Sequence, residues 1–171
     1  MLIQNDEGKW SYFSFNGIKI FNSTSGKSGG APHNNLGEMS FDSPTNFLNS
    51  KYNSEGSKED IEQDRINGYG YTEGYILPTT PKEDKIIKNN FMKAVNEGYN
   101  LLTNQCTNSV QKALNSVGIK TTTIYNFNYS TSYGAVFPMS PHDRVEVNPY
   151  LPSSAFKAIR DNNPRGIYIK R

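Results

Sequence analysis

Two amphipathic helical patterns follow one another in the middle of the 171-residue chain. The first starts with Thr80 and Pro81 and completes a capping box at Glu83, which predicts a helix over residues 81–97. The second predicts a helix over residues 105–117 from apolar residues spaced one helical turn apart: Val110, Ala113, Leu114 and Val117. Because only seven residues separate the two helices, we expect an antiparallel αα pair.

Strand patterns open the chain before this helix pair. Met1–Gln4 and Lys9–Phe15 are short alternating segments joined by a turn. Asn16-Gly17 is a strong hairpin signal, and Ile18–Phe21 alternates again after it. We therefore expect an antiparallel β-meander at the start, followed by a Ser/Gly-rich loop over Asn22–Gly37.

Weaker patterns complete the expected layout. Ser43 and Pro44 predict a short helix through Leu48, and Ser153 or Ser154 would cap a last short helix. The remaining expected elements are a polar helix over 57–66, an aromatic strand over 69–77, a strand over 121–125 and a terminal strand over 167–169. The tyrosines of the segment 69–75 either line a substrate groove or pack in the core, and the pattern leaves both open.

These elements predict one α+β domain over residues 1–171, with an antiparallel sheet packed on the αα pair. A chain of this length can bury one adequate core. Mean hydropathy is low, at −0.70, but aromatic residues make up 12% of the chain. Because the polarity comes from amides and hydroxyls more than from charge, the composition indicates a folded domain.

Composition and charge exclude several classes of function. A net charge of +2 with 20% charged residues gives no electrostatic basis for binding nucleic acid. No apolar segment has the length of a membrane span, and Met1–Glu7 lacks the features of a signal peptide. On its own the chain is therefore expected to be cytoplasmic.

Cys106 is the only cysteine, so no disulfide can form within the chain. It lies four residues before Val110, at the start of the second predicted helix and on its inward face. Asn104 or Thr103 is expected to cap this helix. Unpaired backbone N–H groups at a helix start favour the thiolate, which is the nucleophilic form of cysteine. The alternative is a cysteine that simply packs in the core.

A nucleophilic cysteine needs a nearby base, and the chain has two histidines. His33 lies in the glycine-rich loop and is the preferred candidate, with His142 as the other. Glu38 or Glu73 would be able to orient the base. One cysteine and two histidines lack the spacing of a zinc site, and the glycines near Lys27 do not form a phosphate-binding loop. We expect neither a metal nor a cofactor.

The segment around Cys106 resembles a known family. The run Tyr-Asn-Leu-Leu-Thr-Asn-Gln-Cys-Thr-Asn-Ser-Val-Gln-Lys-Ala-Leu over residues 99–114 is similar to the cysteine helix of circularly permuted papain-like domains, the relatives of NlpC/P60 and lecithin:retinol acyltransferase proteins. The segments 26–37 and 148–152 also resemble C-terminal domains of Rhs-type polymorphic toxins of Bacteroidetes. The specific match covers about twenty residues around Cys106.

The resemblance implies a permuted papain-like fold and a hydrolase or acyltransferase acting on amide or ester bonds. Cys106 would be the nucleophile, His33 the base, and Asn104 a supporting residue. The substrate would be a peptide, a cell-wall component or a lipid. The domain would be the C-terminal part of a larger secreted antibacterial effector, and the producing cell would need an immunity protein that covers the site.

One departure from the family pattern leaves an alternative open. The family usually carries its catalytic histidine at the start of an early strand, and that position would fall just before Met1 in this sequence. The base is therefore either His33 or a residue preceding Met1. The alternative function is a papain-like module that binds a glycan or protein without catalysis.

Overall fold

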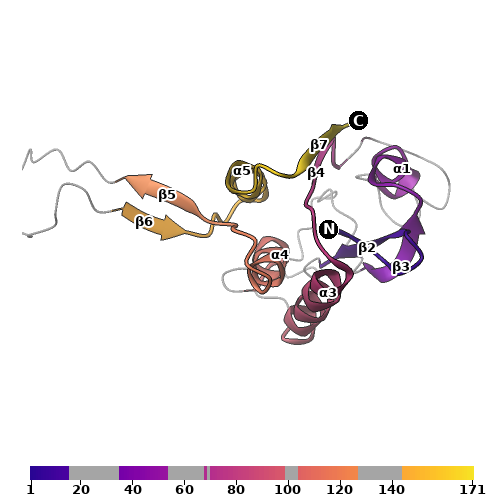
Figure 1. Cartoon of the computed structure of the whole chain (residues 1–171), viewed down its shortest axis with the longest axis horizontal. Helices are drawn as coiled ribbons and strands as arrows, with labels where there is room; N and C mark the ends of the chain where they lie inside the picture. Colours follow the sequence, from indigo (N-terminus) through magenta and orange to yellow (C-terminus); the bar gives the residue numbers. More distant parts are fainter. Residues whose placement is uncertain (16–34, 54–67, 69, 99–103, 127–143) are drawn as a thin grey trace, which may run out of the picture.

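The structure is a computed structural model that describes residues 1–15, 35–53, 68, 70–98, 104–126 and 144–171 (Figure 1). The expected hairpin at Asn16-Gly17, the strand Ile18–Phe21 and the polar helix over 57–66 lie outside these residues. His33 and His142 also lie outside them.

The chain opens with a three-stranded antiparallel sheet in the order β1-β2-β3. Its strands are β1 (Leu2–Gln4), β2 (Trp10–Ser14) and β3 (Asn35–Phe41). The first two strands match the prediction. Residues 35–37 were expected to end a loop, but β3 already starts there and pairs with β2. That prediction was wrong because glycine and asparagine weaken a strand pattern, whereas pairing with a neighbouring strand overrides it.

The predicted helix pair is present as α3 (Pro81–Asn96) and α4 (Cys106–Asn115). Thr80 and Glu83 form the expected capping box of α3. The two helices pack against each other and run antiparallel, because Glu83 in the first turn of α3 and Val117 after the end of α4 line the same small pocket. One core joins the helices to the three-stranded sheet, and its buried members are Ile3, Phe13, Phe15, Ile87, Phe91, Ala113 and Leu114.

The other helices and strands surround this shared core. The short helix α1 (Pro44–Leu48) begins after Ser43 as predicted and is followed by a 3-10 turn, η1 (Lys51–Asn53). The C-terminal helix α5 has Leu151 at its N-cap position and no side-chain cap, so the predicted serine cap was wrong. The remaining elements are α5 (Pro152–Asn162), β4 (Glu73–Ile76), β7 (Ile167–Lys170), β5 (Thr123–Asn126) and β6 (Arg144–Val147).

The observed fold class is mixed α+β with small antiparallel sheets. In place of one sheet, the described strands form three, because β4 pairs only with β7 and β5 pairs only with β6. The β5–β6 ribbon projects away from the body of the molecule in Figure 1. Among the described residues, no helix has both the length and the apolarity needed to cross a bilayer.

Candidate functional site

Cys106 is the first residue of α4 and is partly buried. It lines a cavity of about 820 Å³ whose walls come from β1, β2, β4, β7, α1, α3, α4 and α5. The predicted position of the thiol at the helix start is therefore found, and the thiol side of α4 faces a space large enough for a small-molecule or peptide group. The Cys106 Sγ atom lies 3.9 Å from the Thr107 hydroxyl oxygen.

The N-terminus of α4 has no side-chain cap among the described residues. Gln105 occupies the cap position, and its amide instead donates a hydrogen bond to the Tyr150 carbonyl at 2.9 Å. Backbone N–H groups in the first turn of a helix have no partner within the helix. The first turn of α4 therefore presents backbone donors beside Cys106.

Asn104 does not cap α4, which corrects the prediction. Its buried amide donates to the carbonyl oxygens of Ala94 at 2.6 Å and Gly98 at 2.8 Å. Its side-chain oxygen accepts a bond from the Lys112 amine at 3.3 Å. Asn104 thus binds carbonyls at the C-terminal end of α3 and fixes the start of α4 against it.

Two tyrosines from distant parts of the chain also line the cavity. Tyr12 lies on β2 and Tyr71 lies just before β4. Both rings pack on Phe47, with ring centroids 4.6 Å away for Tyr12 and 6.3 Å away for Tyr71. Burial raises the pKa of both hydroxyls, and the nearby charge of Cys106 adds to the effect. Both groups therefore stay protonated near neutral pH.

The first residue of the chain faces the same space. The Met1 α-amino group is buried and donates a hydrogen bond to the Phe13 carbonyl at 2.9 Å. Burial lowers its pKa to about 6, while the charge of Cys106 opposes that shift. The start of β1 and the thiol are therefore close enough for their charges to interact.

A buried glutamine on α4 adds a further polar group to the cavity wall. The Gln111 amide donates to the Pro149 carbonyl at 2.9 Å, and its side-chain oxygen has no hydrogen-bond partner within the described part of the chain. Only 2% of Gln111 is exposed. A buried amide oxygen without a partner is costly and suits a hydrogen-bond donor on a ligand.

The other predicted site residues have different surroundings. The two histidines lie outside the described residues. Glu38 is exposed on β3, and Glu73 accepts a hydrogen bond from the Tyr168 hydroxyl. Among the described residues, no group of three histidine, cysteine, aspartate or glutamate side chains is placed to hold a metal ion.

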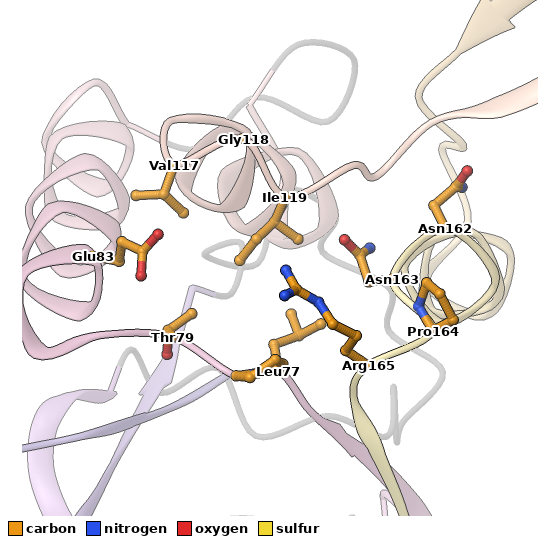
Figure 2. Close-up of a pocket in the computed structure, with 11 residues that line it drawn as sticks. Leu77, Thr79, Glu83, Val117, Gly118, Ile119, Asn162, Asn163, Pro164 and Arg165 are labelled. Carbon is orange, nitrogen blue, oxygen red and sulfur yellow. The ribbon is translucent and has the colours of Figure 1, made fainter.

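A second, smaller pocket of about 370 Å³ lies at the far end of α4 (Figure 2). Arg165 directs its guanidinium group into this pocket, between Leu77 and Ile119. Glu83 contributes a carboxylate at the edge. The lining residues include no thiol and no imidazole, so this pocket offers no nucleophile of the kind predicted at Cys106.

Nothing in the sequence marks Gln111 or Tyr12 as a site residue. The only signal for Tyr71 was the tyrosine-rich segment 69–75, for which a groove was one of two interpretations. Tyr12 carried no signal at all, because its strand alternation is equally typical of an ordinary sheet.

Comparisons with known proteins return no relative. The chain matches no protein-family model, no curated protein and no solved structure. The functional argument therefore depends on the residues around Cys106 and on the geometry of the cavity.

Proposed function

We propose that this protein is a cysteine-dependent hydrolase or acyltransferase that acts on amide or ester bonds, with Cys106 as the nucleophile. One observation carries the proposal: the thiol lies at the first residue of a helix and lines a cavity of about 820 Å³. A thiol in that position meets unpaired backbone donors that favour its reactive form. The local resemblance to permuted papain-like domains supports the same chemistry.

The reaction follows from this arrangement. His33 accepts the thiol proton, and the Cys106 sulfur attacks the substrate carbonyl carbon to form a C–S bond. Backbone N–H groups in the first turn of α4 bind the oxygen that becomes negative. When the C–N or C–O bond breaks, His33 returns the proton to the leaving group. Water, or a second acceptor in an acyltransferase, then releases the acyl group from sulfur.

The base has a second candidate in addition to His33. A residue joined to Met1 in a longer chain would precede the buried start of the chain, and Met1 lines the same cavity as Cys106. The resemblance expects a histidine at that position. His33 remains the proposed base because it belongs to this sequence.

Alkylation of Cys106 by iodoacetamide tests the nucleophile and the base together. We expect the wild-type chain to keep more of its pH 9 labelling rate at pH 6 than the His33→Ala variant does, because the imidazole accepts the thiol proton. His142→Ala is the matched control and should label like the wild type. If His33→Ala leaves the pH dependence unchanged, His33 is not the base.

The biological setting that we propose is an antibacterial effector domain of a larger secreted protein, acting on a peptide, cell-wall or lipid substrate. This part rests on the resemblance to Rhs-type toxins, and it implies an immunity protein that covers the cavity. Expression with and without an export signal tests it. Toxicity that Cys106→Ala abolishes supports a catalytic effector. Toxicity that survives this substitution favours the second candidate, a non-catalytic binding module, for which the tyrosines of the cavity wall would provide the contact surface.

A further inference from the structure

We propose that the smaller pocket, of about 370 Å³, binds the carboxylate of a small apolar ligand through the guanidinium group of Arg165. Such a carboxylate has two sources, the C-terminal end of a peptide and a free aliphatic acid. The inference does not depend on the chemistry proposed for Cys106, because Cys106 is not among the described residues that line this pocket.

The guanidinium group of Arg165 is a directed cation without a partner. It points into the pocket between Leu77 and Ile119 (Figure 2). Within the described part of the chain, no hydrogen bond or ion pair joins this group to another residue. A guanidinium presents its N–H donors in a planar fork that fits both oxygens of a carboxylate. The pocket therefore offers a carboxylate a bidentate partner beside two apolar side chains.

The backbone from which Arg165 projects is held in place. The carbonyl of Asn163 accepts a hydrogen bond from the Tyr75 hydroxyl at 2.7 Å and one from the Gly166 N–H at 3.1 Å. Gly166 packs so closely on the Tyr75 ring that a Cβ atom at this residue would overlap it. These contacts fix the turn on both sides of Arg165, so less of the binding free energy is spent on ordering the backbone around the ligand.

Two asparagines at the end of α5 complete the polar part of the wall. The side-chain amide of Asn163 donates to the Lys120 carbonyl at 2.8 Å, and that of Asn162 donates to the Thr122 carbonyl at 2.7 Å. Both bonds hold the segment after α4 against the end of α5. The two side-chain oxygens accept no hydrogen bond within the described residues, so they provide acceptors for an N–H group of a peptide ligand.

The electrostatic surroundings favour an anion with a single charge. The pocket lies at the C-terminal ends of α4 and α5, where the helix dipole is negative. At its edge, the Glu83 carboxylate accepts two hydrogen bonds from Thr80 at 2.7 Å and forms no ion pair with Arg165 within the described chain. A phosphate dianion would be repelled by this carboxylate, whereas one carboxylate balances the one guanidinium.

Titration of the full chain, followed by NMR of labelled methyl groups, tests the proposal. N-acetylleucine is the probe, since it joins a carboxylate to an apolar side chain and a peptide N–H. We expect it to shift the methyl signals of Leu77 and Ile119 saturably. N-acetylleucinamide lacks the charge and should bind roughly tenfold more weakly or worse, because a charge-assisted bond is lost.

Arg165→Gln should weaken the binding of N-acetylleucine by the same factor. Arg160→Gln is the matched control, since Arg160 lies on α5, donates to Asp161 and does not line the pocket. It should bind like the wild type. The probe 4-methylpentanoate distinguishes the two sources of the carboxylate. Weaker binding than that of N-acetylleucine identifies a peptide end, and equal binding identifies an aliphatic acid.

Four outcomes would overturn the proposal. They are tight binding of N-acetylleucinamide, unchanged binding by Arg165→Gln, tighter binding of inorganic phosphate than of N-acetylleucine, and no saturable shift with either carboxylate. None of these titrations involves the thiol. Their failure therefore leaves the proposed function of Cys106 unaffected, and a failure of that function leaves this site unaffected.

Discussion

At the scale of single residues, close contacts explain why one position requires a particular residue type, which the composition does not reveal. Gly37 lies in β3 with a φ of +92°, and a Cβ atom there would lie 2.7 Å from the ring of Phe13. Phe13 in turn meets Phe91 of α3 edge to face, with ring centroids 6.0 Å apart. The absence of a side chain at residue 37 therefore lets the sheet and the helix pair share one core.

Gly37→Ala should destabilise the protein more than a glycine substitution that introduces backbone strain alone. Gly118 is the matched control, because its φ is +78° and a Cβ atom at this residue would meet no other atom within 4 Å. We expect Gly118→Ala to cost about 1 kcal/mol of unfolding free energy, and Gly37→Ala to add about 1–3 kcal/mol of overpacking. Urea unfolding measures both, and equal losses would contradict the contact with Phe13.

At the scale of elements, the two central helices begin in different ways. The start of α3 is closed by the Thr80 side chain, which accepts a bond from the Glu83 N–H at 3.3 Å. The start of α4 has no such cap, since the amide of Gln105 binds the Tyr150 carbonyl. Capping stabilises α3 locally, whereas α4 depends on tertiary contacts and keeps backbone donors beside Cys106.

The capping box of α3 gives a pH-dependent prediction. Hydrogen bonds from the hydroxyl and the N–H of Thr80 hold the pKa of Glu83 below its ordinary value of 4.5. The charged carboxylate therefore stabilises the folded state above pH 4.5, and this contribution is lost as the pH falls through the lowered pKa. Glu83→Ala should lower the melting temperature at pH 7 and have a smaller effect at pH 3. An equal loss at both values would show that the charge is not responsible.

At the scale of the whole molecule, the sequence predicts what local signals determine and misses what distant pairing determines. The helix 81–97 follows from its capping box and the glycine after it, and α4 follows from its apolar spacing and the glycine after it, whereas the predicted cap of α4 is wrong. The strand β6 and the division into three sheets do not, because β4 pairs with β7 from the far end of the chain. The residues of the candidate site also differ in whether local sequence signals predict them. Cys106 marks a local boundary, whereas Tyr12 and Tyr71 meet only through folding.

Two glutamines of α4 hold the segment before α5 against that helix, and this arrangement gives the last prediction. Gln105 and Gln111 on α4 donate to the carbonyls of Tyr150 and Pro149, two adjacent residues just before α5. Removing either donor takes one hydrogen bond from the segment, and the loss of such a bond costs about 1–3 kcal/mol if the carbonyl stays buried.

Because both bonds hold one short segment, the segment should detach more easily once the first bond is lost. Gln105→Leu and Gln111→Leu together should therefore destabilise the protein by less than the two single substitutions combined, with a coupling of about 0.5–3 kcal/mol in a double-mutant cycle. Urea unfolding of the four proteins measures this coupling. Strictly additive losses would mean that the two bonds act on independent parts of the chain, and that Pro149 and Tyr150 do not move as one unit.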